Sequence, residues 1–171
     1  ERFTRTLLTL WMQLKPNQFY IKSHVPSSKN GRRCSCFQRA TKRDGTAGKA
    51  GILLASEACE KYLAATKMQW FDTAKKFRDY VKSKGLTYPL TVRFHFIRCD
   101  KSSFDWVGPL ETVQDCMTGH KFEGSLKGLK VRQNPFAWLP DDSVHYLTPD
   151  VANSTFTVDK ETAGVIIEVV G

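Results

Sequence analysis

The stretch PLTVRFHFIR at residues 89–98 determines much of the expected fold, because apolar and polar side chains alternate along it. Strict alternation with a period of two is typical of a β-strand buried on one face only. One face carries Leu90, Val92, Phe94 and Phe96, and the other carries Thr91, Arg93, His95 and Ile97. The pattern predicts that Phe94 and Phe96 are buried and that Arg93 and His95 point away from the core.

The segments around this strand add two helices and two further strands. Residues 56–84 have the apolar spacing of an amphipathic helix, with Ser56 as N-cap and Gly85 as stop signal. Its aromatic side chains follow the helical spacing, so we interpret them as core residues and not as a platform on which bases stack. Strands are expected at 19–25 and 164–170 and a helix at 109–117, with Pro109 in its first turn. The expected fold is α+β, a small mixed sheet with helices packed on it.

Length and composition restrict the class of protein. A chain of 171 residues suits a single domain, and 41% hydrophobic residues supply a core that a disordered polybasic protein lacks. No apolar run reaches the roughly 18–20 residues of a membrane span, so no membrane partner is expected.

Positive charge is concentrated in the first quarter of the chain. Residues 1–43 hold ten basic side chains and one acid, a net charge of +9, and the remaining 128 residues balance 16 basic against 16 acidic side chains. Such a block is either a solvated arm or a surface for a polyanion. Because it also contains Phe19, Tyr20 and Phe37, we favour nucleic-acid binding. The candidate contacts are Lys29, Arg32, Arg33, Arg39, Lys42, Arg43 and Arg93.

Other motifs have less weight. The polar stretch at about 27–51 is expected to be a mobile loop, and its GTAGKAG segment is not a phosphate loop because Ala50 follows Lys49.

The five cysteines lack zinc-site spacing and are expected to be free thiols in a reducing, intracellular compartment. The chain begins at Glu1, and residues 1–11 are similar to the remnant of an organellar presequence. The mitochondrial matrix and a bacterial or phage-host cytoplasm are both compatible with these features.

Acidic residues stand out in this basic protein. They occur in FDWVGPLETVQD at residues 104–115 and in WLPDD at residues 138–142. Convergent carboxylates hold Mg²⁺ in nucleases, because this hard cation prefers oxygen ligands. The alternative is ordinary: Asp105 caps a helix, and Asp141 and Asp142 lie in a solvated turn.

These acidic segments resemble the RusA-type Holliday-junction resolvases, in particular a branch common in gut bacteria and their phages. VPSSKNGRR at 25–33 and AGVIIEV at 163–169 also resemble that branch, so the resemblance extends in short islands over most of residues 19–170. It implies a basic arm at 1–18 and a single RusA-like domain at 19–171. It further implies a homodimer that acts on branched DNA with Mg²⁺.

The resemblance also implies roles for individual acids. Asp105 matches the first metal-binding acid and Asp142 the last, so these two would hold Mg²⁺; Asp115 matches the helical acid and Asp141 the partner of Asp142. The chain departs from the family at Val107, Gly108 and Glu111, which replace an acid, an asparagine and the catalytic lysine. Glu111 either reverses the charge near the phosphate or serves as a substitute ligand. Residues at about 118–137 are interpreted as an insertion relative to the family, in which the linker between the two acidic segments is shorter.

Two classes of function follow from these features. The first is a nucleic-acid-binding protein with a degraded active site and no cofactor, such as a structural subunit of an organellar ribonucleoprotein like the mitochondrial ribosome. The second is an active Mg²⁺-dependent endonuclease that resolves Holliday junctions or other branched DNA, with Asp105, Asp115, Asp142 and Glu111 as catalytic candidates. We favour the first, because of the altered acidic segment, the insertion and the basic arm. The expected partners are branched DNA or structured RNA, together with a second copy or ribonucleoprotein neighbours.

Overall fold

The computed structural model describes residues 14–26, 56–101, 105–119, 122 and 134–171, together with the backbone of four short strands between them. The main sheet has the order β1–β9–β6–β7, with β8 also paired to β6, and its pairings are both parallel and antiparallel. The elements of this sheet are β1 (Gln18–Lys22), β6 (Leu90–Arg98), β7 (Leu147–Pro149), β8 (Thr155–Val158) and β9 (Gly164–Val169). With helices α2 (Glu57–Ser83) and α3 (Val107–Met117), the fold is α+β, as predicted.

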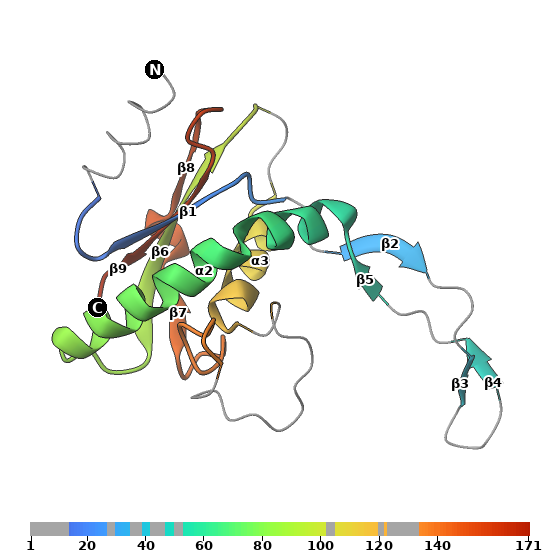
Figure 1. Ribbon diagram of the computed structural model, residues 1–171, viewed down its shortest axis with the longest axis horizontal. Coiled ribbons are helices and arrows are strands. Elements are labelled where there is room, and N and C mark those ends of the chain that lie inside the picture. Colours follow the sequence, from blue (N-terminus) through green and yellow to red (C-terminus); the bar gives the residue numbers. More distant parts are fainter. Residues whose placement is uncertain are drawn as a thin grey trace.

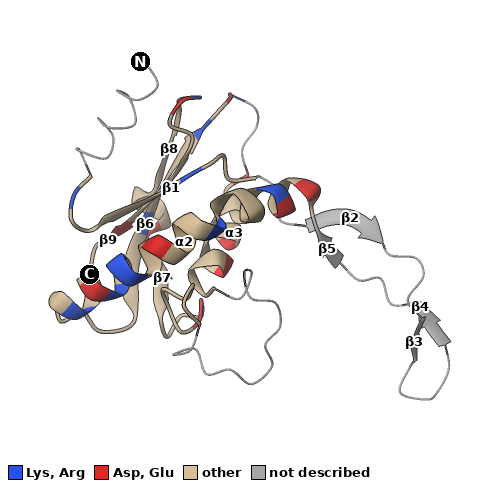
Figure 2. Cartoon of the chain, viewed as in Figure 1, with Lys and Arg blue, Asp and Glu red and all other residues tan. Residues whose placement is uncertain are grey.

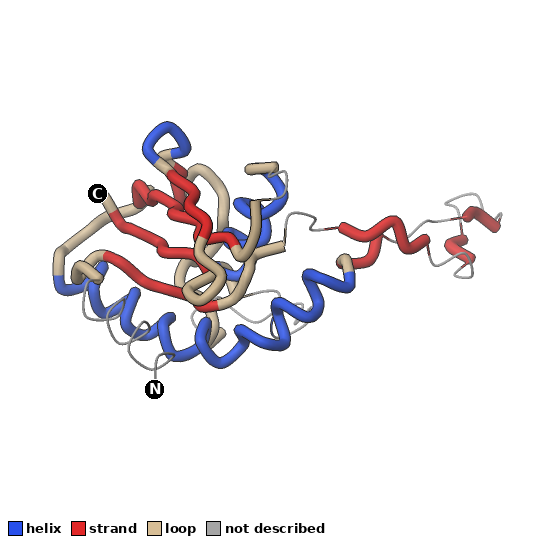
Figure 3. Tube along the Cα trace, turned by 90° about the horizontal axis from the view of Figure 1, so that it is seen from above, coloured by secondary structure: helices blue, strands red, loops and turns tan. Residues whose placement is uncertain are grey.

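Helix α2 begins and ends at the predicted signals. The Ser56 side chain accepts a hydrogen bond from the amide of Cys59 at 3.1 Å, which satisfies one of the amides left over at a helix start. Gly85 adopts a φ of +61° just after the last turn, a conformation that glycine adopts without steric cost. The helix runs along one side of the sheet, as Figures 1 and 3 show.

The core lies between this helix and one face of the sheet. Trp70 and Phe77 of α2 and Phe94 of β6 are fully buried in one cluster, to which α3 adds Val113 and Met117. Phe94 and Phe96 are 0% and 2% exposed, whereas Arg93 and His95 are half-buried on the opposite face. The register predicted for residues 89–98 is therefore confirmed.

The opposite face of the sheet carries a polar network. His95 lies 3.0 Å from Glu168 on β9 and 2.9 Å from the Thr155 hydroxyl on β8. On the same face Arg93 forms an ion pair of 2.7 Å with Asp150. The side chains of three strands are thus cross-linked on the side away from α2, because neighbouring strands place opposed residues within reach of each other.

The expected loop at 27–51 differs from the prediction, since it contains strands. β2 (Asn30–Cys34) pairs with β5 (Leu53–Ala55), and β3 (Arg39–Thr41) pairs with β4 (Ala47–Lys49), both antiparallel. Figure 1 shows these two ribbons beyond the N-terminal end of α2, apart from the main sheet. These strands were not predicted because the segment is polar and contains glycine. Local propensity is a weak signal for strands with few apolar side chains.

Part of the predicted insertion at 118–137 contributes to the core. Phe122 and Phe136 are nearly buried and stack with ring centroids 5.3 Å apart, and Trp70 of α2 lies 6.3 Å from Phe122. Residues 120, 121 and 123–133 lie outside the described residues. No helix among the described residues is long and apolar enough to cross a membrane.

Candidate functional site

Helix α3 separates two of the predicted acids. It starts at Val107, two residues earlier than predicted, so Pro109 occupies its first turn, where an amide hydrogen has no helical partner to lose. Asp105 lies before the helix, and its carboxylate accepts a hydrogen bond from the Val107 amide at 3.1 Å. Asp115 lies in the last turn. At 1.5 Å per residue, the two acids are about 15 Å apart along the helix axis.

The segment that follows the predicted insertion is fixed to the C-terminal end of α3. The amides of Trp138 and Leu139 both donate to the carbonyl of Met117, at 2.8 and 3.2 Å. Both side chains are buried, and the Trp138 indole also donates to the carbonyl of Trp70 at 3.1 Å. This attachment brings the following Asp141 and Asp142 towards the last turn of α3.

Asp115 and Asp142 are close enough to influence each other. Partial desolvation raises the pKa of Asp142, the negative charge of Asp115 raises it further, and Asp141 contributes through a side-chain hydrogen bond. The Asp142 amide donates to the Asp141 carboxylate at 3.0 Å. Two neighbouring carboxylates disfavour each other's ionisation, so a cation or a proton between them would relieve the repulsion. We call Asp115, Asp141 and Asp142 the acidic cluster.

Only part of the predicted constellation therefore comes together. Asp115 and Asp142 converge, Asp105 lies before the opposite end of α3 and accepts from the Val107 amide, and Glu111 is an exposed side chain between them. In the described part of the chain no group of three His, Cys, Asp or Glu side chains is arranged to hold a metal ion. Mg²⁺ is usually held by one or two carboxylates, and Asp115 and Asp142 are two that lie within electrostatic reach of each other. The assignment of Asp105 and Asp142 to one Mg²⁺ site stays a prediction.

The predicted basic contacts are distributed over several elements. Arg32 and Arg33 belong to β2 and Arg39 to β3, of which the backbone is described, and Lys29, Lys42 and Arg43 lie outside the described residues. Arg93 is the one whose side chain is described. Its side chain is 32% exposed and paired with Asp150.

A second basic surface was not singled out from the sequence. The C-terminal half of α2 and the turn after it carry five exposed cations, which we call the basic helix end: Lys75, Lys76, Arg78, Lys82 and Lys84. Figure 2 shows the blue bands that they form on this part of α2. Lys75 pairs with Asp79, and Arg78 donates to the carbonyl of Ala137. The density of Lys and Arg at 75–84 was the available signal, but a polar helix face explains it equally well.

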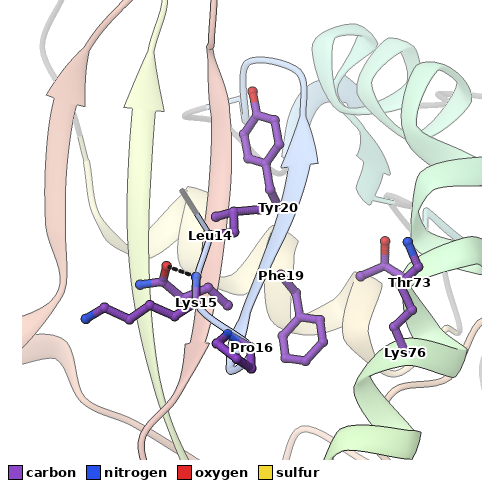
Figure 4. Close-up of a pocket in the computed structure, with 8 residues that line it drawn as sticks. Leu14, Lys15, Pro16, Phe19, Tyr20, Thr73 and Lys76 are labelled. Atoms are coloured by element: carbon purple, nitrogen blue, oxygen red, sulfur yellow. Dashed lines mark hydrogen bonds between the residues drawn. The ribbon is translucent and has the colours of Figure 1, made fainter. Parts of the chain in front are cut away.

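A cavity of about 270 Å³ lies between the start of β1 and α2. Figure 4 shows its lining, to which Lys15 and Phe19 contribute from the β1 side and Thr73 and Lys76 from α2. None of the predicted acids lines it. It is therefore separate from the acidic cluster, although Lys76 links it to the basic helix end.

Comparisons with known proteins leave the family open. No family model matches the chain, and neither the curated proteins nor the solved structures include a significant match. The RusA resemblance thus remains an expectation from short motifs, while the fold class is given by the structure itself.

Proposed function

We propose that the protein binds nucleic acid through two basic surfaces on an α+β scaffold, and that the acidic cluster is the remnant of a metal-dependent site. The observation that carries this proposal is that three of the cations in the first quarter of the chain lie on described strands. Arg32, Arg33 and Arg39 belong to paired strands that extend beyond the start of α2 (Figure 1). A two-stranded ribbon has the dimensions to enter a major groove, and its cations contact phosphates.

The basic helix end supports the same proposal from the described side chains. Residues 72–84 contain five cations and only two acids, Asp72 and Asp79. All five cations are exposed, which leaves them accessible to phosphate groups. Such a surface is the electrostatic footprint of a polyanion-binding protein.

The geometry of the acids favours binding over cleavage. Asp105, which the resemblance assigns to the metal, lies before the start of α3, at the end opposite to Asp115. Glu111 stands where the family has a catalytic lysine, and an acid there opposes the build-up of negative charge on a phosphate in the transition state. Loss of one such stabilising group lowers catalytic rates by about 10²–10³.

The proposal is tested by the salt dependence of binding. Replacement of Arg32, Arg33, Arg39, Lys42 and Arg43 by glutamine should flatten the slope of log K against log[salt], by about 0.7–0.9 for each phosphate that the variant no longer neutralises. The matched control replaces Lys61 and Lys67, which are exposed on the N-terminal half of α2, and its slope should change less. An equally steep slope in the five-site variant would show that this quarter of the chain is only a solvated arm.

A second candidate function is a Mg²⁺-dependent endonuclease. The observation that favours it is the mutual influence of Asp115 and Asp142, because a cation at the acidic cluster would relieve their repulsion. The residues that would hold the ion are Asp115 and Asp142, and the ion would polarise a phosphate and activate water. Cleavage of a four-way DNA junction in Mg²⁺ or Mn²⁺, abolished in Asp142→Asn and kept in Asp72→Asn, would establish this function and overturn the degraded site.

A further inference from the structure

Two tyrosines form an aromatic pair in which Tyr88 is exposed and Tyr146 is half-buried. Tyr88 lies in the turn between α2 and β6, and Tyr146 lies just before β7. Their ring centroids are 5.3 Å apart with planes at 76°, and Tyr88 is 43% exposed. The Leu90 amide donates to the Tyr146 carbonyl at 3.0 Å, which holds the two segments side by side. The pair is therefore a fixed aromatic surface and not two independent side chains.

One cation, Arg78, lies within electrostatic reach of this pair. Burial raises the pKa of Tyr88, Tyr146 raises it further, and the positive charge of Arg78 lowers it, which places Arg78 within electrostatic reach of the ring. The basic helix end finishes at Lys84, four residues before Tyr88. An exposed aromatic ring next to cations can hold a single strand, since a base stacks on the ring and the cations contact the phosphates.

The pair also lies close to the acidic cluster along the chain. Asp142 is followed directly by a turn in which the Tyr146 amide donates to the Ser143 carbonyl at 2.9 Å. The segment that carries Asp142 thus also carries one of the two rings.

We propose that Tyr88 and Tyr146 form a stacking platform for an unpaired base, whose neighbouring phosphates contact the basic helix end. This inference rests on the proposed nucleic-acid binding and specifies its substrate class: strands with unpaired nucleotides, such as the arms of a branched or looped structure. Phe156, which is also exposed, lacks this charge context, because its edge strand β8 contains no cation.

The test compares single-stranded and duplex DNA. The probes are an oligothymidylate of about 15 nucleotides, long enough for one binding site, and a duplex of equal length, both measured by fluorescence anisotropy at one salt concentration. Tyr88→Ala should weaken binding of the single strand by about 5- to 150-fold, the range for one stacked base. Duplex affinity should change by less than a factor of about two, because phosphate contacts dominate it. Tyr88→Phe should retain the single-strand affinity, and Phe156→Ala is the matched control with no expected change.

The outcomes separate this inference from the proposed function. Wild-type protein that binds neither probe overturns both. Wild-type protein that binds both probes, with unchanged affinities in Tyr88→Ala and in Tyr88→Leu, overturns the platform and leaves the proposed function standing. Equal weakening of binding to the two probes in Tyr88→Ala would assign Tyr88 a structural role and would also overturn the platform. The platform is likewise overturned if Tyr88→Ala changes the oligomeric state on size-exclusion chromatography while oligothymidylate binding is unchanged.

Discussion

Replacement of Trp138 by phenylalanine tests how the acidic cluster is held in place. Trp138 is 1% exposed, and its ring centroid lies 5.0 Å from both Trp70 and Phe77. Its indole also donates to the Trp70 carbonyl at 3.1 Å. The residue therefore fixes the segment before Asp141 and Asp142 to α2 and to the core at the same time.

The expected cost can be worked out from these contacts. The smaller ring removes about two methylene equivalents of buried surface, roughly 1–2 kcal/mol including the space left behind. Loss of the indole hydrogen bond adds about 1 kcal/mol. The sum of about 2–3 kcal/mol is a large fraction of the roughly 5–15 kcal/mol that is typical of a whole domain.

The assay is urea unfolding followed by far-ultraviolet circular dichroism. With a slope of about 1–3 kcal/mol per molar urea, the midpoint of Trp138→Phe should fall by about 1 M or more. Phe71→Leu is the control, because Phe71 is 41% exposed and its replacement should cost less than about 1 kcal/mol. A destabilisation below about 1 kcal/mol in Trp138→Phe, equal to that of the control, would refute the anchoring role.

Three further changes test other parts of the structure. Asp142→Asn should stabilise the protein at neutral pH by less than about 1 kcal/mol, because the folded state raises this pKa and so disfavours the charged form. The gain should vanish as the pH falls through the pKa of Asp142 and the wild-type carboxyl becomes protonated; a gain that grows in acid would contradict the repulsion by Asp115. Gly164→Ala should lower the free energy of unfolding in urea by about 2–3 kcal/mol, since a Cβ there would collide with the carbonyl of Ile21 and lie 2.6 Å from the ring of Tyr20. An unchanged free energy of unfolding would show that β9 is placed differently. Gln69→Ala should cost about 1–2 kcal/mol in the same assay, because its amide makes two hydrogen bonds, of 2.8 and 3.0 Å, to the backbone of the last residue of β1; an unchanged midpoint would show that these bonds do not hold β1 to α2.

The sequence allowed prediction of the elements whose signals are local. Alternation at 89–98 predicted which side chains of β6 are buried, and Ser56 and Gly85 predicted the ends of α2 to within a residue or two. Strands β7 and β8 were missed, because they are only three and four residues long and depend on pairing with β6. Their sequences carry no periodic pattern long enough to read.

The site was predictable only in part for a related reason. The positions of Asp115 and Asp142 on two segments were visible in the sequence, but their approach depends on the attachment of residues 138 and 139 to Met117. The hydrogen bond from the Val107 amide to Asp105 depends on the start of α3 at Val107, two residues earlier than Pro109 suggested. Contacts of this kind are tertiary, and a resemblance between motifs does not encode them.

The position of β9 at the centre of the sheet has a consequence for synthesis on the ribosome. Gln18 lies opposite Glu168, and β9 separates β1 from β6, so neither of those strands has a partner along the inner edge until residues 164–169 have emerged. Pairings between segments so distant in sequence form slowly, because a long loop must close first. During translation the apolar face of α2 and two open strand edges therefore stay accessible to chaperones, and the nascent chain is most vulnerable to aggregation in the interval just before residues 164–169 emerge.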